Sequence, residues 1–172
     1  MSIQLREVSK ENWYDCTQLN VSEEQLKVFS FPVVYWIAES KYDDDLELRA
    51  VYSDDEIVGF IVYSSKPDQE KSYWIMAFMI DEKYQGKGYG KVAMEKLIEI
   101  MHTNYNCKKI MLGHRPNNFL AASFYESLGF KKKSDELIDG ETVRVLVISD
   151  NKNICDSNYS LLTAHPHNLV EK

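Results

Sequence analysis

The clearest chemical signature in this sequence is a glycine-rich run, Gln85-Gly86-Lys87-Gly88-Tyr89-Gly90. It follows an apolar segment with the pattern of a buried strand and precedes a segment with the spacing of an amphipathic helix. Backbone N–H groups at such a junction, helped by the helix dipole, can bind phosphate groups. Glycine lets the backbone approach a ligand closely because it carries no Cβ. The run therefore indicates a phosphate-binding loop, with a plain glycine-rich turn as the structural alternative.

Two common phosphate-binding loops do not match this run. A dinucleotide fingerprint requires the spacing G-x-G-x-x-G, whereas the glycines here follow the spacing G-x-G-x-G. A Walker loop requires Ser or Thr directly after its Gly-Lys pair, and Lys91 is followed by Val92. The loop therefore belongs to neither of these classes.

A second motif, residues 118–130, lies one predicted strand beyond the glycine-rich run. It fits the pattern Asn-x-x-Ala-x-x-x-Tyr-x-x-x-Gly-Phe, and the run at Gln85 fits the pattern Gln/Arg-x-x-Gly-x-Gly/Ala. In that order and at that distance, the two patterns resemble the signatures of the GCN5-related N-acetyltransferase (GNAT) family. The resemblance covers roughly residues 3–148. Within the family, the chain looks most like the bacterial spermine/spermidine (diamine) N-acetyltransferases.

The resemblance implies acetyl-CoA as the cosubstrate, and no metal ion is expected because the cysteines form no C-x-x-C pair. In the family, the strand before the loop separates from its neighbour, and the pantetheine arm of CoA lies in the gap as an additional strand. The residues that this implies for CoA binding are Phe78, Met79 and Ile80 through their backbone, Gln85, Gly86, Lys87, Gly88, Tyr89, Gly90 and Lys91 around the pyrophosphate, and Asn118 at the CoA arm. The structural alternatives are a helix N-cap for Asn118 and solvated surface positions for Lys87 and Lys91.

Tyr125 is the catalytic residue that the resemblance implies, since it matches the tyrosine that protonates the departing thiolate of CoA. A backbone N–H on the preceding strand would bind the thioester oxygen as negative charge develops there. The alternative for Tyr125 is a core aromatic residue whose hydroxyl reaches the surface.

The implied acceptor is an amine, and a polyamine needs carboxylates at intervals along its binding site. The acidic residues that could supply them are Glu23, Glu24, Glu39, Asp43, Asp44, Asp45 and Glu47, with ordinary solvated acids as the alternative. Polyamine acetyltransferases usually carry an acidic residue on the central strand, where this chain has Met76 and Ala77. The reaction therefore needs another base, a water chain or a less basic amine. We predict acceptor contacts for Glu39 and for His114, whose imidazole is the candidate base.

Three functions remain open on the sequence. The first is transfer of acetyl from acetyl-CoA to a primary amine of a small molecule, with spermine or spermidine as the favoured acceptor. The second is acetylation of an antibiotic or of a peptide N-terminus. The third is a degenerate family member that binds CoA as a sensor or interaction module; Met76 and Ala77 favour it, whereas Tyr125 argues against it.

The predicted elements form an α+β domain with a mixed, mostly antiparallel central sheet, a splayed central strand pair and helices on both faces. Strands are predicted over residues 3–8, 48–52, 57–63, 73–80, 108–113 and 142–148. Helices are predicted after a capping box at Ser22, after Pro32, after the glycine-rich run and after Asn118.

Two of these predictions specify local detail. Pro32 is expected in the first turn of its helix, followed by an apolar face made of Val33, Val34, Ile37 and Ala38. Asp139-Gly140 predicts a tight hairpin turn before the last strand.

The composition is that of one globular domain. The chain has 172 residues, 44% of them hydrophobic, and a net charge of −7, which argues against a nucleic-acid partner. We expect one N-acetyltransferase domain over residues 1–149 and a tail over residues 150–172. The sequence shows no segment with the roughly 18 apolar residues of a membrane span, no signal peptide and no paired-cysteine motif among Cys16, Cys107 and Cys155. A cytoplasmic protein that acts on a small-molecule amine is expected, and a homodimer is compatible with the sequence.

Overall fold

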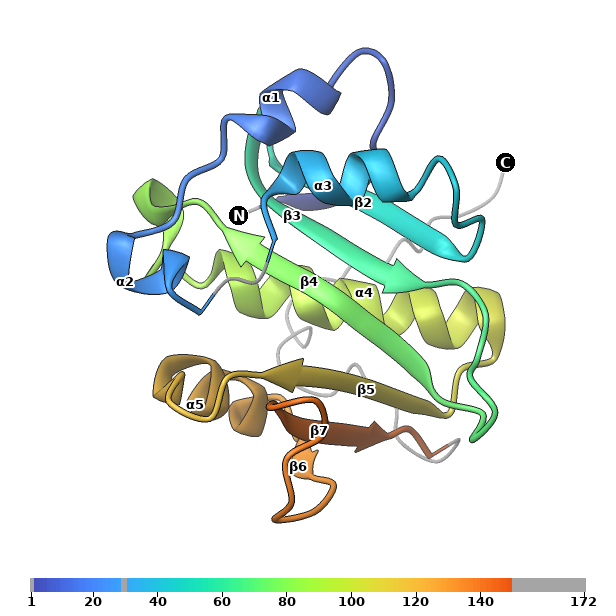
Figure 1. The fold of residues 1–172 in the computed structure, drawn as a ribbon. Helices are drawn as coiled ribbons and strands as arrows, with labels where there is room; N and C mark the ends of the chain where they lie inside the picture. The colour runs from blue at the N-terminus through green and yellow to red at the C-terminus, as the bar shows by residue number, and fades with distance from the viewer. Residues whose placement is uncertain (1, 29–30, 150–172) are drawn as a thin grey trace, which may run out of the picture.

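The computed structural model describes residues 2–28 and 31–149, and over this part of the chain seven strands form one sheet (Figure 1). The strands are β1 (Ile3–Glu7), β2 (Leu46–Ser53), β3 (Glu56–Ser64), β4 (Tyr73–Ile80), β5 (Lys109–His114), β6 (Lys131–Lys132) and β7 (Thr142–Val147). Their order in the sheet is β1-β2-β3-β4-β5-β7-β6, and every neighbouring pair is antiparallel except β4 and β5. The predicted α+β class with a mostly antiparallel sheet is confirmed. The predicted tail lies outside the described residues.

Helices cover both faces of the sheet. They are α1 (Trp13–Thr17), α2 (Glu23–Leu26), α3 (Val33–Glu39), α4 (Tyr89–Tyr105) and α5 (Phe119–Ser127), with a short 3-10 helix η1 (Glu82–Tyr84). The larger core cluster joins α4 and α5 to one face, and a second cluster joins α1 and α3 to the other. In Figure 1, α4 runs behind β4 and α3 crosses in front of the sheet. None of the helices described is both long and apolar enough to cross a bilayer.

The central strands β4 and β5 separate along their length. They pair only at Tyr73–Ile110, Trp74–Met111 and Ile75–Leu112. On the other side of β4, Tyr63 pairs with Ile75 and Val62 pairs with Ala77, so that Met76 is the extra residue of a β-bulge. A bulge bends its strand and locally increases its twist. The gap between β4 and β5 therefore opens at the bulge, as predicted for the splayed strand pair.

Several helix caps and one turn lie where the local sequence patterns predict them. Ser22 and Gln25 form both hydrogen bonds of the predicted capping box at α2. The Asn118 side chain caps α5 by accepting from the backbone N–H of Ala121. Asp139 and Gly140 both have positive φ values, 51° and 78°, which suits a two-residue hairpin turn.

The predicted apolar face of α3 is partly wrong. Pro32 is the N-cap rather than a first-turn residue, and the helix begins at Val33. Val33 and Trp36 are buried, whereas Val34 is 53% exposed and Ala38 is also exposed. Burial follows the helical spacing that starts from Val33, so the large indole of Trp36 takes the place expected for Val34.

Candidate active site

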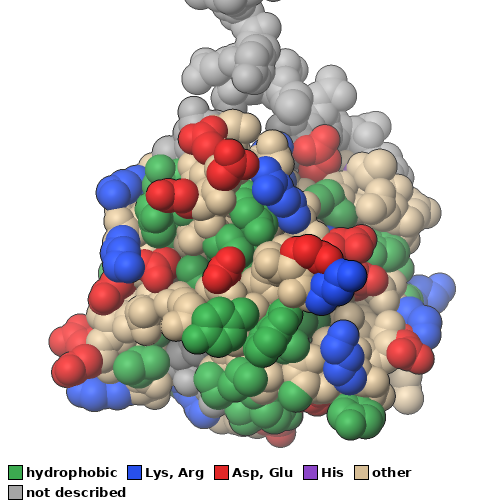
Figure 2. Space-filling view, turned by 90° about the horizontal axis from the view of Figure 1, so that it is seen from above, with side chains coloured by type: hydrophobic (Ala, Val, Ile, Leu, Met, Phe, Trp, Pro, Cys, Tyr) green, Lys and Arg blue, Asp and Glu red, His purple; other side chains and the backbone are tan. Residues whose placement is uncertain are grey.

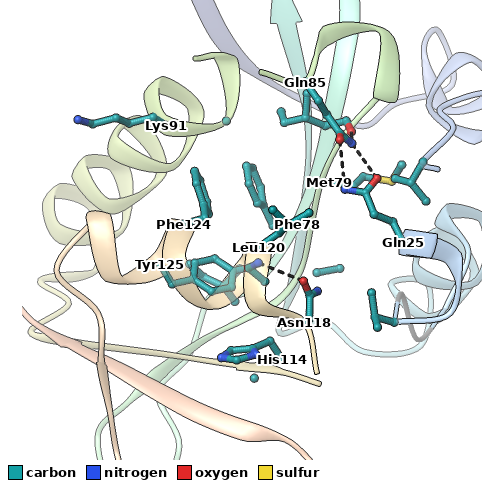
Figure 3. Close-up of a pocket in the computed structure, with 18 of the residues that line it drawn as sticks. Gln25, Phe78, Met79, Gln85, Lys91, His114, Asn118, Leu120, Phe124 and Tyr125 are labelled. Atoms are coloured by element: carbon teal, nitrogen blue, oxygen red, sulfur yellow. Dashed lines mark hydrogen bonds between the residues drawn. The ribbon is translucent and has the colours of Figure 1, made fainter. Parts of the chain in front are cut away.

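A pocket of about 690 Å³ lies where β4 and β5 separate (Figure 3). Its walls come from β4, the loop and first turn of α4, the start of α5, the end of β5 and the chain around α2 and α3. The residues that line it include Gln25, Phe31, Trp36, Trp74, Met76, Ala77, Phe78, Met79, Ile80, Gln85, Gly86, Gly88, Tyr89, Gly90, Lys91, Gly113, His114, Asn118, Phe124, Tyr125 and Glu141. The two sequence motifs, 28 residues apart at their nearest ends, thus line one cavity.

The glycine-rich loop presents free backbone donors to this pocket. Gly86 and Gly88 have φ values of 72° and 84°, which L side chains rarely adopt. Within the described chain, no backbone N–H from residue 86 to residue 91 donates a hydrogen bond to another protein group. These groups precede and open a 17-residue helix, so its dipole adds to their attraction for anions. The loop can therefore bind a phosphate group through its main chain.

The Gln85 side chain holds the loop in place through hydrogen bonds within the protein. Its Nε2 donates to the backbone oxygen of Ile80 at 2.7 Å and to Gln25 Oε1 at 3.0 Å. Gln25 Nε2 in turn donates to Gln85 Oε1 at 3.1 Å (Figure 3). These bonds tie the loop to the end of β4 and to α2. The sequence predicts only a capping box at Ser22 in this segment, because no local signal marks the partner of Gln25, which lies 60 residues away.

The backbone of β4 offers hydrogen-bonding groups to the gap at alternate residues. Asp81 donates to Val58 of β3, and the Met79 carbonyl also points toward β3. The N–H and C=O groups of successive residues in a strand point to opposite edges. Those of Phe78 and Ile80 therefore point away from β3, into the gap. Of the three residues predicted to contact pantetheine, Phe78 and Ile80 are the two whose main chain faces the gap, although the Ile80 carbonyl oxygen also accepts from Gln85.

Tyr125 lies on α5 with its ring buried among Phe124, Phe130 and His114. Burial, and secondarily the charge of Glu141, raise the pKa of Tyr125 to about 12. The phenol therefore stays protonated at neutral pH. No group of the described chain forms a hydrogen bond with its hydroxyl, and the residue lines the pocket, so the proton is available to a ligand.

His114 is poorly placed to act as a base, because both ring nitrogens are engaged. Nδ1 lies 2.9 Å from the backbone oxygen of Arg115, to which it donates, and Nε2 accepts from Arg144 Nε at 2.9 Å. Arg144 is buried and also donates through Nη2 to Glu126 Oε1 at 2.9 Å. The lone pair that would take a proton from an amine is already occupied by a guanidinium. We interpret His114 as a structural residue of this network.

We expect Arg144→Met to lower the free energy of unfolding by about 1–3 kcal/mol, the cost of leaving a buried polar partner unsatisfied. His114 Nε2 would lose its donor in the protein interior. Urea unfolding of the wild type and the variant measures the change. The control is Arg115→Met, which removes an exposed guanidinium and should alter stability by less than about 0.5 kcal/mol. Equal stability of Arg144→Met and wild type would contradict a structural role for the network.

The remaining predicted residues fall at the edge of the site or outside it. Lys91 lines the pocket, but its side chain extends away from the centre (Figure 3). Lys87 is exposed and donates to the backbone oxygen of Lys83, and Glu39 on α3 is not among the lining residues. In the part of the chain that the structure describes, no group of three or more His, Cys, Asp or Glu side chains is arranged to hold a metal ion.

Residues 8–130 match the family described as Acetyltransferase (GNAT) family. The chain belongs to the GNAT family. It is 31% identical over 150 residues to the spermine/spermidine N(1)-acetyltransferase of Bacillus subtilis, covering 84% of this chain and 98% of that protein. The GNAT assignment makes the protein an N-acetyltransferase.

Two further similarities place this GNAT protein among its relatives. It is 25% identical over 107 residues to an N-alpha-acetyltransferase of Saccharolobus solfataricus, covering 57% of this chain and 64% of that protein. Its fold is similar to that of the spermidine N-acetyltransferase from Vibrio cholerae in complex with CoA and spermine, with a TM-score of 0.67 and 18% identity over 84% of this chain and 95% of that one. The last comparison shows a shared fold.

Proposed function

We propose that this protein transfers the acetyl group of acetyl-CoA to a primary amine of a small polyamine. The observation that carries the proposal is the continuity of one pocket from the free N–H groups of the loop, past the open edge of β4, to the Tyr125 hydroxyl. This arrangement suits a long, strand-like donor with phosphates at one end and a thioester at the other. The choice of a polyamine as the acceptor is supported by two curated relatives, whose names describe acetyltransferases of spermine or spermidine.

Each part of the pocket has a role in the proposed reaction. The loop N–H groups bind the pyrophosphate, and the main chain of Phe78 and Ile80 pairs with the pantetheine amides. A backbone N–H of β4 binds the thioester oxygen as charge develops on it. Tyr125 donates its proton to the sulfur when the carbon–sulfur bond breaks, and the Asn118 amide nitrogen, left free by the N-cap bond through Oδ1, contacts the CoA arm.

The direct test is a panel of amines incubated with acetyl-CoA, with release of free thiol followed over time. The panel contains spermine, spermidine, putrescine, an aromatic monoamine and a short peptide with a free N-terminus. We expect turnover with spermine and spermidine. Absence of turnover with all three polyamines, alongside turnover of another amine, would overturn the polyamine acceptor and keep the acetyltransferase.

Charge attraction should make the Michaelis constant for spermine depend on salt. The chain carries a net charge of −7, and Glu23 and Glu24 occupy the first turn of α2 beside the pocket residue Gln25. Exposed attractions of this kind are screened as the Debye length falls from about 10 Å at 0.1 M salt to about 3 Å at 1 M. Steady-state assays across this range should show KM for spermine rising roughly threefold or more, with kcat changed less. A KM that is independent of salt would contradict electrostatic recognition of the acceptor.

A peptide N-terminus is the second candidate acceptor, because the outer pocket is rich in aromatic surface. Phe31, Trp36 and Trp74 all line it, and Phe31 stacks on Tyr35 with ring centroids 4.4 Å apart. Figure 2, which views the molecule from the side of α1 and α3, shows hydrophobic side chains grouped beside acidic ones. Apolar walls of this kind suit an amine attached to an apolar side chain. Preferential turnover of the peptide in the amine panel would favour this second function.

A further inference from the structure

We propose that Glu141 holds the acceptor ammonium and takes its proton, thereby supplying the carboxylate that the central strand lacks. The inference rests on the proposed acetyl transfer and adds a residue to it. Glu141 ends the hairpin that the Asp139-Gly140 turn forms, one residue before β7. No local sequence pattern marks Glu141, because the position of its side chain depends on how the hairpin packs against β5.

Glu141 is the one carboxylate among the pocket-lining residues of the described chain. Met76 and Ala77, at the positions where an acid was expected, line the same pocket from β4. Within the described residues, no side chain donates a hydrogen bond or forms an ion pair with the Glu141 carboxylate. Both of its oxygens are therefore able to accept from a ligand.

A glycine on the neighbouring strand makes room for this carboxylate. Gly113 lies near the end of β5, beyond the last residue that pairs with β4. A Cβ placed on Gly113 would overlap Glu141 Oε2, and its three nearest atoms would all belong to Glu141. The carboxylate thus lies across the main chain of β5, where this strand borders the gap. The backbone of Gly113 is not in the left-handed region, so conformation alone does not require glycine here.

The surroundings of Glu141 fit a role in charge and proton transfer. The titratable or charged groups that approach it are Tyr125 from α5, His114 from β5 and Arg115, whose guanidinium approaches the hairpin at Gly140. His114 has both nitrogens engaged, as described above. Tyr125 stays protonated at neutral pH, so Glu141 and the phenol form a base and an acid that line the same pocket.

In the proposed reaction, the acceptor nitrogen loses two protons and the sulfur of CoA gains one. The ammonium nitrogen gives one proton to Glu141, and its freed lone pair forms the carbon–nitrogen bond to the thioester carbon. The tetrahedral intermediate collapses when the carbon–sulfur electron pair leaves with sulfur, which takes the Tyr125 proton. The nitrogen then loses a second proton, which restores the phenol, while Glu141 passes its own to water. The products are the amide, free CoA thiol and one proton.

The experiment compares Glu141→Gln with the matched control Glu136→Gln, which makes the same charge change at an exposed position before the same hairpin. At pH 7 we expect kcat/KM for spermine to fall by about 10²–10⁴ in Glu141→Gln, the usual range for a lost general base, and to stay near wild type in the control. The loss should shrink as the pH approaches about 10, where an alkylamine loses its own proton. The thermal shift given by acetyl-CoA should be unchanged.

Gly113→Ala tests the placement of the carboxylate without removing it. The added methyl group would displace the Glu141 side chain, so this variant should lose activity in the same pH-dependent way. In a Glu141→Gln background, the same change should cause little further loss, because the displaced group is already inactive.

The outcomes separate this inference from the proposed function. A wild type that acetylates spermine together with an equally active Glu141→Gln variant would overturn the role of Glu141 alone. A loss of activity that is the same at every pH would also overturn it, since it would indicate only a structural effect. A wild type that acetylates no amine would overturn both proposals.

Discussion

Tyr125→Phe should lower the single-turnover rate of acetyl transfer by about 10²–10⁴, the usual contribution of a general acid. The substitution removes one hydroxyl and keeps the ring, so its packing against Phe124 and Phe130 is retained. The free energy of unfolding and the affinity for acetyl-CoA should therefore change little. The loss should appear in kcat and, by a similar factor, in kcat/KM, as for an interaction made only in the transition state.

Rapid-quench measurement of one turnover is the appropriate assay, because product release can hide the chemical step in the steady state. Tyr73→Phe is the matched control, since it removes a hydroxyl that donates to the Tyr105 backbone oxygen and does not line the pocket. It should leave the single-turnover rate unchanged. An unchanged rate in Tyr125→Phe would make this residue a packing residue and require the proton to come from water.

Gly88→Val should abolish the rise in melting temperature that acetyl-CoA gives to the wild type. At a ligand concentration of 100 times Kd, that stabilisation is about 2.7 kcal/mol. Gly88 has a φ of 84°, and no atom of residues 2–28 or 31–149 lies within 4 Å of the position that a Cβ would take. The side chain of valine would therefore occupy the space in front of the free N–H groups and would strain the backbone that orients them.

Gly129→Val is the control for Gly88→Val, because it strains the backbone at a positive φ without changing the phosphate-binding loop. Gly129 has a φ of 90° after the end of α5 and lies outside the glycine-rich loop. This control should melt at a lower temperature than wild type and still respond to acetyl-CoA in differential scanning fluorimetry. A folded Gly88→Val protein with a full response to acetyl-CoA would show that the loop does not bind the phosphates.

Elements with a strong local signal could be predicted from the sequence. The capping box at Ser22, the N-cap at Asn118 and the Asp139-Gly140 turn each depend on hydrogen bonds or φ values within a few residues. The strand before the glycine-rich loop, the helix after it and the next strand were predicted from the same kind of local pattern. For this reason the protein scaffold around the pocket agrees well with the prediction.

Features that depend on distant partners could not be predicted in the same way. The bulge at Met76 is defined by the register against Tyr63 and Val62, and no glycine or proline marks it. The bond between Gln25 and Gln85 and the contact of Arg144 with His114 join residues 60 and 30 positions apart. The position of Glu141 over Gly113 likewise depends on how β5 and β7 align. These contacts shape the part of the pocket wall near His114 and Glu141, for which the local sequence gives no signal.

The main chain and the side chains of β4 border the pocket in different ways. The ladder that β4 offers consists of the main-chain groups of Phe78 and Ile80, which every amino acid except proline possesses. Replacement of side chains along this strand therefore leaves the complementarity to an extended, amide-bearing donor intact. The same replacements change the side chains of the pocket wall, to which Met76 and Ala77 belong. A sheet with a missing strand can thus present the same hydrogen-bonding edge whatever side chains its open strand carries.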